Sequence, residues 1–510
     1  MSAPKPFYLT TPIYYVNDAP HIGHAYTTLA CDVLARFLRL DGYYVKFLTG
    51  TDEHGQKVEK SAAAAGEEPR PFVDRVSGNF RELADSMNFS HDDFIRTTEV
   101  RHQEAAWALW KELEAKEQIY LGTYSGWYSV RDEAFYAENE LVDDKAPTGA
   151  DVEWVEEPSY FFRLSEWQAP LLEFYETNPN FIAPPSRRNE VISFVKSGLL
   201  DLSVSRTSFT WGISVPDHAG HVIYVWLDAL TNYLTGIGYP DTKFEEFSTF
   251  WPADIHIVGK DILRFHAVYW PAFLMAAGIM PPKRIFAHGW WTNEGQKISK
   301  SLGNIIDPLP LIKKYGLDPV RFFLIREVPF GKDGDFSHQA IVHRMNGDLA
   351  NDFGNLVQRV LSMIHRNCEA AIPEPGKLTE ADTAFLANID AALSEMRSAM
   401  MEQAFHKALV ILWKRIGEAN RYVDAEAPWE LKKKDPARMC TVLYVLAEAI
   451  RYIAILVQPV MPGSAKKILD QLAAPEDERS FAHLNSEHSL KPGASILKPE
   501  GVFPRYEAVD

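Results

Sequence analysis

Two short motifs, far apart in the chain, carry side chains that suit phosphate chemistry. The first is His21-Ile22-Gly23-His24, which follows a short apolar run and opens a helical pattern. A helix N-terminus presents free N–H groups and partial positive charge, which favour a phosphate chain. The two imidazoles could donate to phosphate oxygens, and Gly23 would leave room for a nucleotide. Taken alone, a His-x-Gly-His motif is more often a pair of capping or partly buried histidines.

The second motif is Lys297-Ile298-Ser299-Lys300-Ser301, with Gly295 and Gly303 on either side. Two lysines three residues apart between glycines make a flexible cationic loop, which can close over a polyphosphate and neutralise developing charge. Considered alone, such a segment is more often a solvated surface turn. The two motifs together, in this order, indicate a nucleotide site built from two distant segments.

The elements around the first motif predict a parallel sheet. Phe7–Thr10 is an apolar run typical of a buried strand, and helical spacing of apolar residues begins at Ile22. Tyr43–Leu48 is a second strand, which leads into Thr49-Gly50-Thr51-Asp52. Strand, helix and strand form a βαβ unit, so ligands should bind beyond the carboxyl ends of the strands. Two later apolar runs, Ile223–Leu227 and Ile255–Val258, are interpreted as further strands of this sheet.

The length of 510 residues predicts two to four domains. We expect an α/β fold, a doubly wound, Rossmann-like parallel sheet interrupted by an inserted module and followed by an all-α helix bundle. The aromatic, strand-like residues 118–222 differ from the α/β segments on both sides, and the pattern is helical beyond residue 349. The predicted domains are two sheet halves at 1–117 and 223–296, an insertion at 118–222, a connecting region with the lysine loop at 297–348, and a helical domain at 349–510.

Composition restricts the class of protein. The net charge of −17, from 52 Lys and Arg against 69 Asp and Glu, disfavours a protein that coats nucleic acid nonspecifically. A negative net charge still allows the protein to bind RNA through a local basic face. Three widely spaced cysteines exclude a Cys-x-x-Cys knuckle and fit a reducing cytosol. No signal peptide is evident, and the apolar segment Leu443–Pro462 carries charges that suit a buried helix, so we expect a cytoplasmic protein that avoids membranes.

The motifs and several neighbouring segments together resemble a known family. Thr11–Asn17, Thr49–Gly55, Tyr224–Ala229 and Val258–Asp261, with both phosphate motifs, are similar to the methionyl-tRNA synthetase family of class I aminoacyl-tRNA synthetases. The similarity follows the family's order over nearly the whole chain. It implies a ligase that uses ATP with Mg²⁺ to activate L-methionine as methionyl-adenylate and transfers it to initiator and elongator tRNA(Met). It implies no role for DNA.

The resemblance implies an ATP site and a methionine pocket. His21, His24, Lys297 and Lys300 would stabilise charge on the phosphates, since an amino-acid carboxylate needs no base to attack. Gly23, Ser299 and Asp261 would also contact ATP. Asp52 would bind the substrate ammonium, helped by the Ile13 carbonyl, and Tyr233 would offer its hydroxyl to the sulfur. The remaining pocket wall and floor would come from Tyr15, Trp226, Ala229, Leu230, Phe265 and His266.

Two further expectations come from the family pattern. Many relatives carry zinc-binding Cys-x-x-Cys pairs in the inserted module, but here Ser129 and Asp132 stand at the first cysteine positions. We therefore expect no structural zinc, with packing of aromatic side chains in its place. In the helical domain, residues matching Asn355, Arg359 and Trp429 would read the CAU anticodon, through amide and guanidinium hydrogen bonds and indole stacking.

Other functions share part of this pattern. Synthetases for leucine, isoleucine or valine have both motifs, but they carry a large editing insertion for which this chain has no room. A catalytically silent RNA-binding paralogue would not need both motifs intact. A small nucleotidyltransferase would leave the helical domain unexplained. The helical region is not followed by an oligonucleotide-binding domain of the kind that dimerises some relatives, so we expect a monomer.

Overall fold

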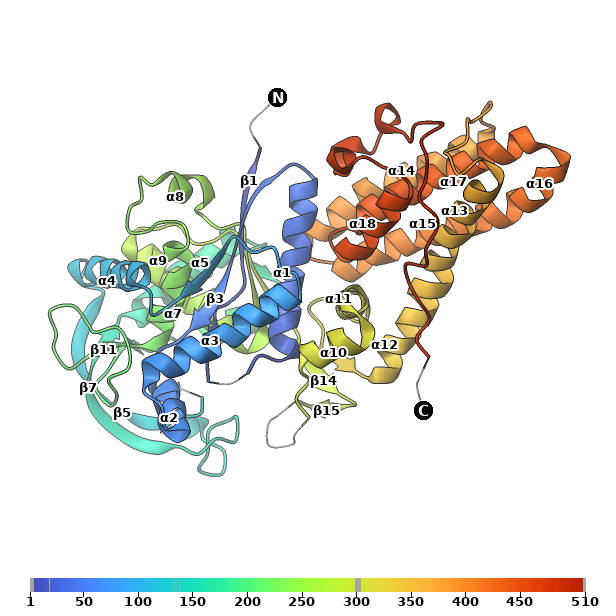
Figure 1. Cartoon of the computed structure of the whole chain (residues 1–510). Coiled ribbons are helices and arrows are strands. Elements are labelled where there is room, and N and C mark those ends of the chain that lie inside the picture. The colour runs from blue at the N-terminus through green and yellow to red at the C-terminus, as the bar shows by residue number, and fades with distance from the viewer. Residues whose placement is uncertain (1–3, 18, 133, 137, 299–303, 508–510) are drawn as a thin grey trace. The chain divides into compact units, whose positions relative to one another are not determined.

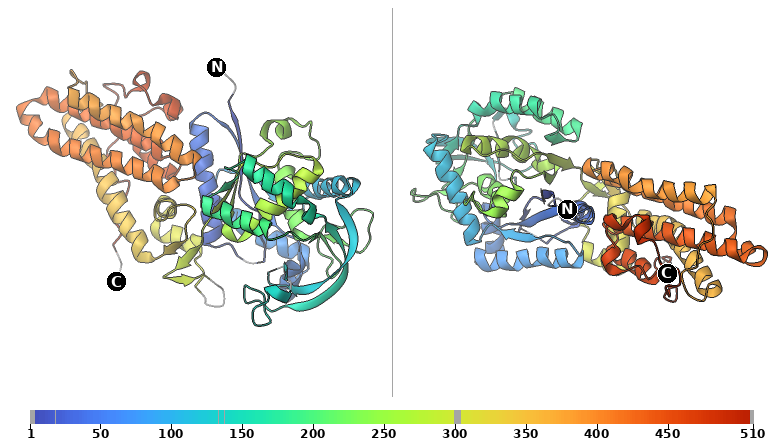
Figure 2. Two further views of the ribbon diagram at one scale, coloured as in Figure 1. Left: turned by 180° about the vertical axis from the view of Figure 1, so that it is seen from behind. Right: turned by 90° about the horizontal axis from the view of Figure 1, so that it is seen from above.

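The computed structural model of the chain consists of two compact units, each treated separately below. One unit contains Pro6–Cys31 and Val45–His288, and the other contains Met1–Lys5, Asp32–Tyr44 and Gly289–Asp510. We call them the sheet unit and the helical unit (Figures 1 and 2). The residues that the structure describes are 4–17, 19–132, 134–136, 138–298 and 304–507.

The sheet unit is organised around seven strands in the order β2-β3-β1-β12-β13-β8, with β4 also paired to β3. The pairings of β3 with β2 and β4, and those that link β1, β12, β13 and β8, are all parallel. This confirms the predicted parallel sheet. The strands are β1 (Pro6–Thr10), β2 (Tyr14–Tyr15), β3 (Tyr44–Asp52), β4 (Asp93–Arg96), β8 (Ile182–Ala183), β12 (Ile255–Gly259) and β13 (Ile285–His288).

The strand order places a topological switch point between β1 and β12. From β1 the sheet continues through β3 on one side and through β12 and β13 on the other. Connections that leave neighbouring strands in opposite directions open a crevice at their carboxyl ends, where ligands bind in such sheets. The segment His21–His24 follows β1, and Gly259 ends β12. The first phosphate motif therefore lies at the topological switch point.

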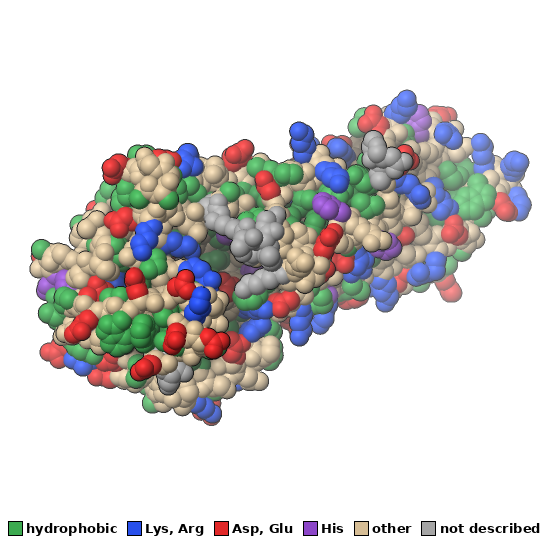
Figure 3. All heavy atoms as spheres, turned by 90° about the horizontal axis from the view of Figure 1, so that it is seen from below, with side chains coloured by type: hydrophobic (Ala, Val, Ile, Leu, Met, Phe, Trp, Pro, Cys, Tyr) green, Lys and Arg blue, Asp and Glu red, His purple; other side chains and the backbone are tan. Residues whose placement is uncertain are grey.

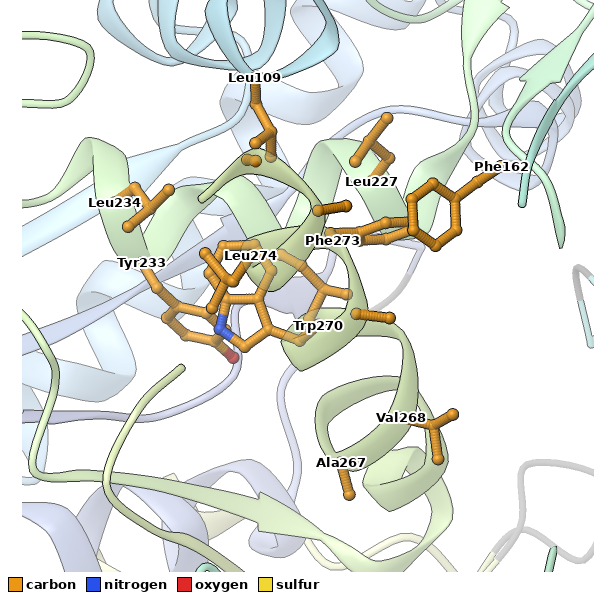
Figure 4. Packing of buried hydrophobic residues seen from close by; sticks show 14 of the residues in the cluster. Leu109, Phe162, Leu227, Tyr233, Leu234, Ala267, Val268, Trp270, Phe273 and Leu274 are labelled. Carbon is orange, nitrogen blue, oxygen red and sulfur yellow. The ribbon is translucent and has the colours of Figure 1, made fainter. Parts of the chain in front are cut away.

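Helices cover the sheet, and their apolar faces form one large core with it. In Figure 4, Leu109, Leu227, Leu234 and Trp270 converge from three different helices, with Tyr233 beside the indole. Burying such side chains contributes about 1.5–3 kcal/mol each to folding. The helices of this unit are α1 (Ile22–Leu40, shared with the helical unit), α2 (Gln56–Ala65), α3 (Pro69–Ser86), α4 (Val100–Ala115), α5 (Gln168–Thr177), α6 (Pro185–Lys196), α7 (Val225–Thr235), α8 (Glu245–Phe250) and α9 (Trp270–Ala277).

One predicted strand is wrong. Residues 223–227 do not extend the parallel sheet, because only Val222–Ile223 is a strand (β11), and it pairs antiparallel with β10 (Ser205–Arg206). The helix α7 begins at Val225, and ten of its eleven residues are buried. A helix that is buried nearly all round has no polar face, so the sequence shows no 3.6-residue period. A short apolar run of this kind cannot be assigned to strand or helix from periodicity alone.

Residues 118–222 contribute strands to two different sheets. Their first part builds an antiparallel sheet, visible in Figure 1 as the long curved strands β5 and β7. The later part returns to the main sheet, since β8 pairs in parallel with β13. The antiparallel strands are β5 (Ile119–Ser129), β6 (Ala134–Tyr136), β7 (Glu153–Phe162) and β9 (Leu202–Ser203).

A hydrogen-bonded cluster surrounds Ser129 and Asp132, the positions at which the family pattern led us to consider zinc ligands. The carboxylate of Asp132 accepts hydrogen bonds from Tyr136, at 3.1 Å, and from Thr148, and Arg131 lies 3.2 Å from its other oxygen. The backbone N–H of Asp132 donates to the hydroxyl of Ser129, which is fully buried. No group of three or more His, Cys, Asp or Glu is placed to hold a metal within the described ranges. Asp132 thus links residues 129–148 of this module through polar contacts.

We expect Asp132→Ala to loosen this module, because it leaves three donors without their acceptor. The loss should be about 1–3 kcal/mol of local stability, seen as native-state proteolysis between β5 and β7 that is roughly tenfold faster. A zinc chelator should not change the cleavage rate of the unaltered protein. Glu156→Ala, at an exposed position of β7, is the matched control and should be cleaved at the original rate. Faster cleavage with the chelator alone would contradict this account.

The helical unit begins with a small sheet and continues as a helix bundle. The hairpin of β14 (Trp291–Asn293) and β15 (Gln296–Lys297) turns at Glu294 and Gly295, which both have positive φ, as a tight two-residue turn requires. Strand β16 (Gly334–Phe336) pairs in parallel with β14. The helices are α10 (Pro308–Tyr315), α11 (Leu317–Arg326), α12 (His338–Arg344), α13 (Asn355–Asn367), α14 (Glu380–Met401), α15 (Phe405–Glu426), α16 (Pro428–Lys434), α17 (Pro436–Val457) and α18 (Pro462–Gln471).

The most apolar helix and the C-terminal segment both belong to the core of this unit. Helix α17 is long and apolar enough to cross a membrane, but 83% of its most apolar window is buried inside the protein. It is the core helix that the sequence predicts. After α18, Phe503 packs against Phe353, and the backbone N–H of Tyr506 donates to Asn346 at 2.8 Å. On the face drawn in Figure 3, acidic and basic side chains both appear across the surface.

Candidate active site

The two histidines of the first motif lie against one another at the start of α1. Their ring centroids are 3.9 Å apart. Nδ1 of His24 accepts a hydrogen bond from the backbone N–H of His21 at 3.1 Å, and Nδ1 of His21 accepts one from Gly23 at 3.0 Å. Because both Nδ1 atoms are acceptors, a neutral ring carries its proton on Nε2. Each histidine therefore has an Nε2–H that can donate to an anion.

Burial keeps the rings of His21 and His24 neutral at neutral pH. Burial lowers the pKa of His21, although the carboxylate of Asp261 opposes the shift. Burial and the nearby charge of His21 lower the pKa of His24 well below its usual value. The rings of Tyr14 and Phe80 pack edge-on against His24, with centroids 4.9 and 5.2 Å away. The pair can therefore donate hydrogen bonds at neutral pH without bringing fixed positive charge.

Gly23 leaves space for the His21 ring. A Cβ atom at this position would lie 2.8 Å from Cε1 of His21. Any other residue would therefore displace the His21 ring from the helix N-terminus. Gly259 has a similar role at the end of β12, since a Cβ there would lie 2.5 Å from the carboxylate of Asp261. Both glycines allow a functional side chain to fold back over the backbone.

Strand pairing brings the first candidate methionine residues together. In the β2–β3 pair, Tyr15 lies directly opposite Asp52. Asp52 is 6% exposed and ends β3 at the carboxyl edge of the sheet. Ile13 immediately precedes β2 and packs against the main core. The sequence analysis missed Lys57, whose ammonium lies 5.1 Å from the centre of the Tyr15 ring.

Helix α7 presents the second group of candidates. Trp226, Ala229, Leu230 and Tyr233 follow the spacing i, i+3, i+4, i+7, so they share one face of the helix. Trp226 is half-buried, whereas Ala229, Leu230 and Tyr233 are buried. The strand first predicted at 223–227 could not have grouped these four side chains. The helical conformation is what makes them neighbours.

A π-helical segment, Phe265–Tyr269, closes against this face of α7. The rings of Trp226 and Phe265 stack at a centroid distance of 3.5 Å and an angle of 9°. The hydroxyl of Tyr233 lies 2.7 Å from Nε2 of His266. Segments of this kind are rare and concentrate at functional sites. The first two residues of the segment therefore make both contacts with α7, Phe265 with Trp226 and His266 with Tyr233.

The hydrogen bond between Tyr233 and His266 has a defined direction. Nδ1 of His266 lies 2.9 Å from the carbonyl oxygen of Ile262, which can only accept. The proton of the neutral ring is therefore on Nδ1, and Nε2 accepts from the Tyr233 hydroxyl. The hydroxyl proton points to His266 in this conformation. A substrate would have to compete with His266 for this proton.

We expect the His266 ring to remain neutral well below neutral pH. Burial lowers its pKa from 6.5 to about 4, so protonation at mildly acidic pH is disfavoured. In NMR spectra of protein labelled with [¹³C]histidine, the His266 signal is identified as the one that disappears in His266→Gln. At about pH 5.5, a ring of ordinary pKa would be mostly protonated, but the His266 signal should keep the chemical shift of a neutral ring. A titration midpoint near the ordinary value would show that the ring is not sealed from water.

The second phosphate motif lies mostly outside the described residues. Lys297 ends β15, and its Cα is paired with Thr292, but its side chain, Ser299, Lys300 and Ser301 are not among the described atoms. The backbone N–H of Gly295 donates to Asp335 at 2.8 Å, which anchors the hairpin that leads into the motif. The structure therefore defines how the chain enters the lysine loop.

The candidate anticodon residues lie close together in the helical unit. The guanidinium of Arg359, on α13, lies 5.4 Å from the ring centre of Trp429, on α16. Trp429 is 45% exposed, which is unusual for an indole with only a structural role. Arg359 also pairs with the exposed Asp424 at 2.8 Å, a partner that the sequence analysis missed. Asn355 is exposed one turn before Arg359 on the same helix.

Comparisons with known proteins agree along the whole chain. The family described as class I tRNA synthetases (M) matches residues 7–151 and 138–361, and the anticodon binding domain of methionyl tRNA ligase matches residues 372–509. The methionine–tRNA ligase of Rickettsia felis is 58% identical, with 98% of each chain covered. That of Mesorhizobium japonicum is 56% identical at the same coverage.

Solved structures show the same similarity in three dimensions. The methionyl-tRNA synthetase of Mycobacterium tuberculosis in complex with methionyl-adenylate is 55% identical and has a TM-score of 0.96, covering 98% of this chain and 100% of that one. The free-state structure of the same enzyme has a TM-score of 0.90 at 52% identity, with 99% of each chain covered. Both units and both family regions lead to one conclusion: the chain belongs to the methionyl-tRNA synthetase family of class I aminoacyl-tRNA synthetases.

Proposed function

We propose that the chain is a methionine–tRNA ligase whose active site is built from the residues described above. It activates L-methionine with ATP and transfers the methionyl group to the 3′-terminal adenosine of tRNA(Met). The strongest support is the position of three groups along the same edge of the sheet: a neutral histidine pair after β1, Asp52 at the end of β3 and Tyr15 at the end of β2. One edge thus carries donors for phosphate and a carboxylate for an ammonium.

In the first step, a methionine carboxylate oxygen attacks the α-phosphorus of ATP, and the bond to the bridging oxygen breaks to release pyrophosphate. No general base is needed, because the nucleophile is already ionised. The Nε2–H groups of His21 and His24 donate to phosphate oxygens, and Lys297 and Lys300 neutralise the charge that develops on pyrophosphate. Mg²⁺ prefers oxygen ligands and enters bound to the ATP phosphates.

Gly23, Ser299 and Asp261 complete the ATP site in this proposal. Gly23 holds the His21 ring over the helix N-terminus. Asp261 follows β12 across the switch point, where its carboxylate can accept from nucleotide hydroxyl groups. The Ser299 hydroxyl is a donor within the cationic loop.

Methionine recognition divides between charge and shape. Asp52 binds the ammonium, and the Ile13 carbonyl accepts one of its remaining protons. The stacked pair of Trp226 and Phe265 covers the thioether, over a floor of Ala229 and Leu230. Tyr15 closes the side next to Asp52. When its proton turns from His266 to the substrate sulfur, the Tyr233 hydroxyl is the polar group that separates a thioether from a hydrocarbon side chain.

The helical unit is proposed to read the CAU anticodon through Asn355, Arg359 and Trp429. An exposed indole beside a guanidinium offers an unpaired base a stacking surface and hydrogen-bond donors. We also propose that the protein acts as a monomer in the cytoplasm. The proposed domains remain 1–117 with 223–296, 118–222, 297–348 and 349–510, with β8 of the inserted range completing the main sheet.

Charging of tRNA transcripts with radiolabelled methionine tests this function. The unaltered protein should charge a tRNA(Met) transcript with the CAU anticodon and should lose most of this activity when the anticodon is changed. Equal charging of both transcripts would reject anticodon recognition. No charging of either would reject the ligase itself.

We expect Trp429→Ala to raise KM for tRNA roughly 10- to 100-fold, since stacking of one base on an aromatic side chain is worth about 1–3 kcal/mol. Methionine activation without tRNA should be unchanged. Trp154→Ala, which also truncates an exposed indole but lies in the sheet unit, provides the matched control for loss of a surface tryptophan. A normal KM for tRNA in Trp429→Ala would remove this residue from the anticodon site.

A further inference from the structure

A buried carboxylate lies directly behind the proposed methionine pocket and has no place in the mechanism above. Asp228 is fully buried on α7, between Trp226 and Ala229. Its two oxygens have different partners, since Nδ1 of His54 lies 2.7 Å from Oδ2 and Nε2 of His102 lies 2.8 Å from Oδ1. His102 is also fully buried. The presence of three polar groups in an apolar core requires an explanation, because burying a charge is costly unless it is well paired.

The three residues come from three different elements. His54 stands two residues after Asp52, where β3 has just ended, and His102 lies on α4. Nδ1 of His102 lies 3.1 Å from the hydroxyl of Thr235, at the last residue of α7. The cluster therefore joins the end of β3, one helix of the core, and the helix that carries the side-chain wall.

The segment after Asp52 is fixed by further contacts. Glu53 is fully buried, and Arg96 binds both of its oxygens, at 2.7 and 2.9 Å. The indole of Trp211 donates to the Glu53 carbonyl at 2.6 Å and packs edge-on against His54. The contact between His54 and Asp228 is a direct side-chain link from this segment to α7.

Burial alone would raise the pKa of Asp228, but the charge on His54 and the hydrogen bonds from both histidines lower it to about 2. The carboxylate is therefore ionised at neutral pH and can only accept hydrogen bonds. Both histidines must present an N–H to it. Charge-assisted bonds of this kind are short and directional, so they hold the joined elements at a defined separation.

We propose that Asp228, held between His54 and His102, is the positioning residue for methionine recognition: it fixes the distance between Asp52, which binds the ammonium, and the face of α7 that contacts the side chain. This inference rests on the proposed function. A substrate held at both ends requires a constant distance between its two subsites, and an error of about 1 Å can cost roughly 100-fold in rate. Asp228 would act through Asp52 and Trp226 without touching methionine.

Asp228→Asn tests this role, because it keeps the shape and removes the charge. We expect KM for methionine in pyrophosphate exchange to rise roughly tenfold or more, with KM for ATP within about twofold of the original. Asp254→Asn is the matched control, because Asp254 accepts from Tyr8 at 2.8 Å just before β12, at the opposite edge of the sheet. It should lose stability without a change in KM for methionine. Unchanged KM for methionine in Asp228→Asn would overturn the proposal.

A double-mutant cycle separates positioning from general loss of structure. If Asp228 acts through Asp52, then Asp228→Asn should raise KM for methionine far less in an Asp52→Asn background than in the original protein. Fully additive effects would overturn the proposal.

Variants of His54 test the same contact while the buried carboxylate of Asp228 stays intact. His54→Ala should raise KM for methionine, whereas His54→Asn should restore it, since an amide nitrogen can replace Nδ1 as the donor to Asp228. Equal KM values in the two variants would contradict the proposal. If the unaltered protein showed no methionine-dependent exchange, the proposed function would fail instead, so the two failures are distinguishable.

Discussion

Asp52→Asn should lower kcat/KM for methionine by roughly 100- to 1,000-fold, since removing one partner of a buried charge pair costs about 3–4 kcal/mol. Asp52 is 6% exposed, so little water is available to stabilise the substrate ammonium once the carboxylate charge is removed. The amide keeps the size of the side chain and its place opposite Tyr15 in the β2–β3 pair. The effect should therefore come from charge and not from repacking.

The Asp52 experiment needs two readouts. KM for ATP should stay within about twofold of the original, because the histidine pair proposed to contact ATP follows β1, whereas Asp52 ends β3. Asp85→Asn, an exposed carboxylate near the end of α3, should leave both KM values unchanged. If Asp52→Asn kept its original KM for methionine, the ammonium would have to be bound elsewhere.

Lys300→Ala should lower the rate of methionyl-adenylate formation by roughly 100- to 1,000-fold, the loss typical of a group that stabilises transition-state charge. Lys297→Ala should have an effect of the same order. The affinity for methionine should not change, because the lysines are proposed to contact pyrophosphate oxygens and not the amino acid. Single-turnover formation of the adenylate measures the first quantity, and calorimetric titration with methionine measures the second.

Lys313→Ala is the matched control for the lysine loop. Lys313 is an exposed lysine on α10, close to the loop in the sequence, so it tests for a nonspecific effect of losing positive charge. It should activate methionine at the original rate. The loop would have no catalytic role if Lys300→Ala or Lys297→Ala matched this control.

The part of the fold that could be predicted is the part governed by local pattern. The buried strand at Phe7–Thr10 and the helix from Ile22 both formed as expected, because a continuous apolar run and a 3.6-residue period are properties of neighbouring residues. Thus the location of His21–His24 at the carboxyl edge of the sheet was predictable. Helix α7 was not, because burial on all sides removes the polar face that marks a helix.

The site itself depends on long-range contacts that no local pattern encodes. Which residue lies opposite Asp52 is set by the register of β2 against β3, and the stack of Trp226 on Phe265 joins segments nearly forty residues apart in the sequence. The direction of the Tyr233 hydrogen bond follows from the carbonyl of Ile262 next to His266. Family resemblance could suggest these residues, but only the packed structure shows what each one contacts.

The buried cluster around Asp228 shows the same limit. His54, His102 and Asp228 are separated by 48 and 126 residues, and nothing in their spacing indicates contact. A histidine in the first turn of α4 would be interpreted as an ordinary core residue, and an aspartate within an apolar helix as an interruption. Their roles become visible only when three elements are brought together by the core.

Methionine-dependent exchange of radiolabelled pyrophosphate into ATP tests the central claim most directly, since it requires the ATP site and the amino-acid pocket at once. The purified full-length chain should catalyse exchange with L-methionine and show no comparable exchange with leucine, isoleucine or valine at equal concentration. Absence of exchange with methionine, or equal exchange with isoleucine, would contradict the account.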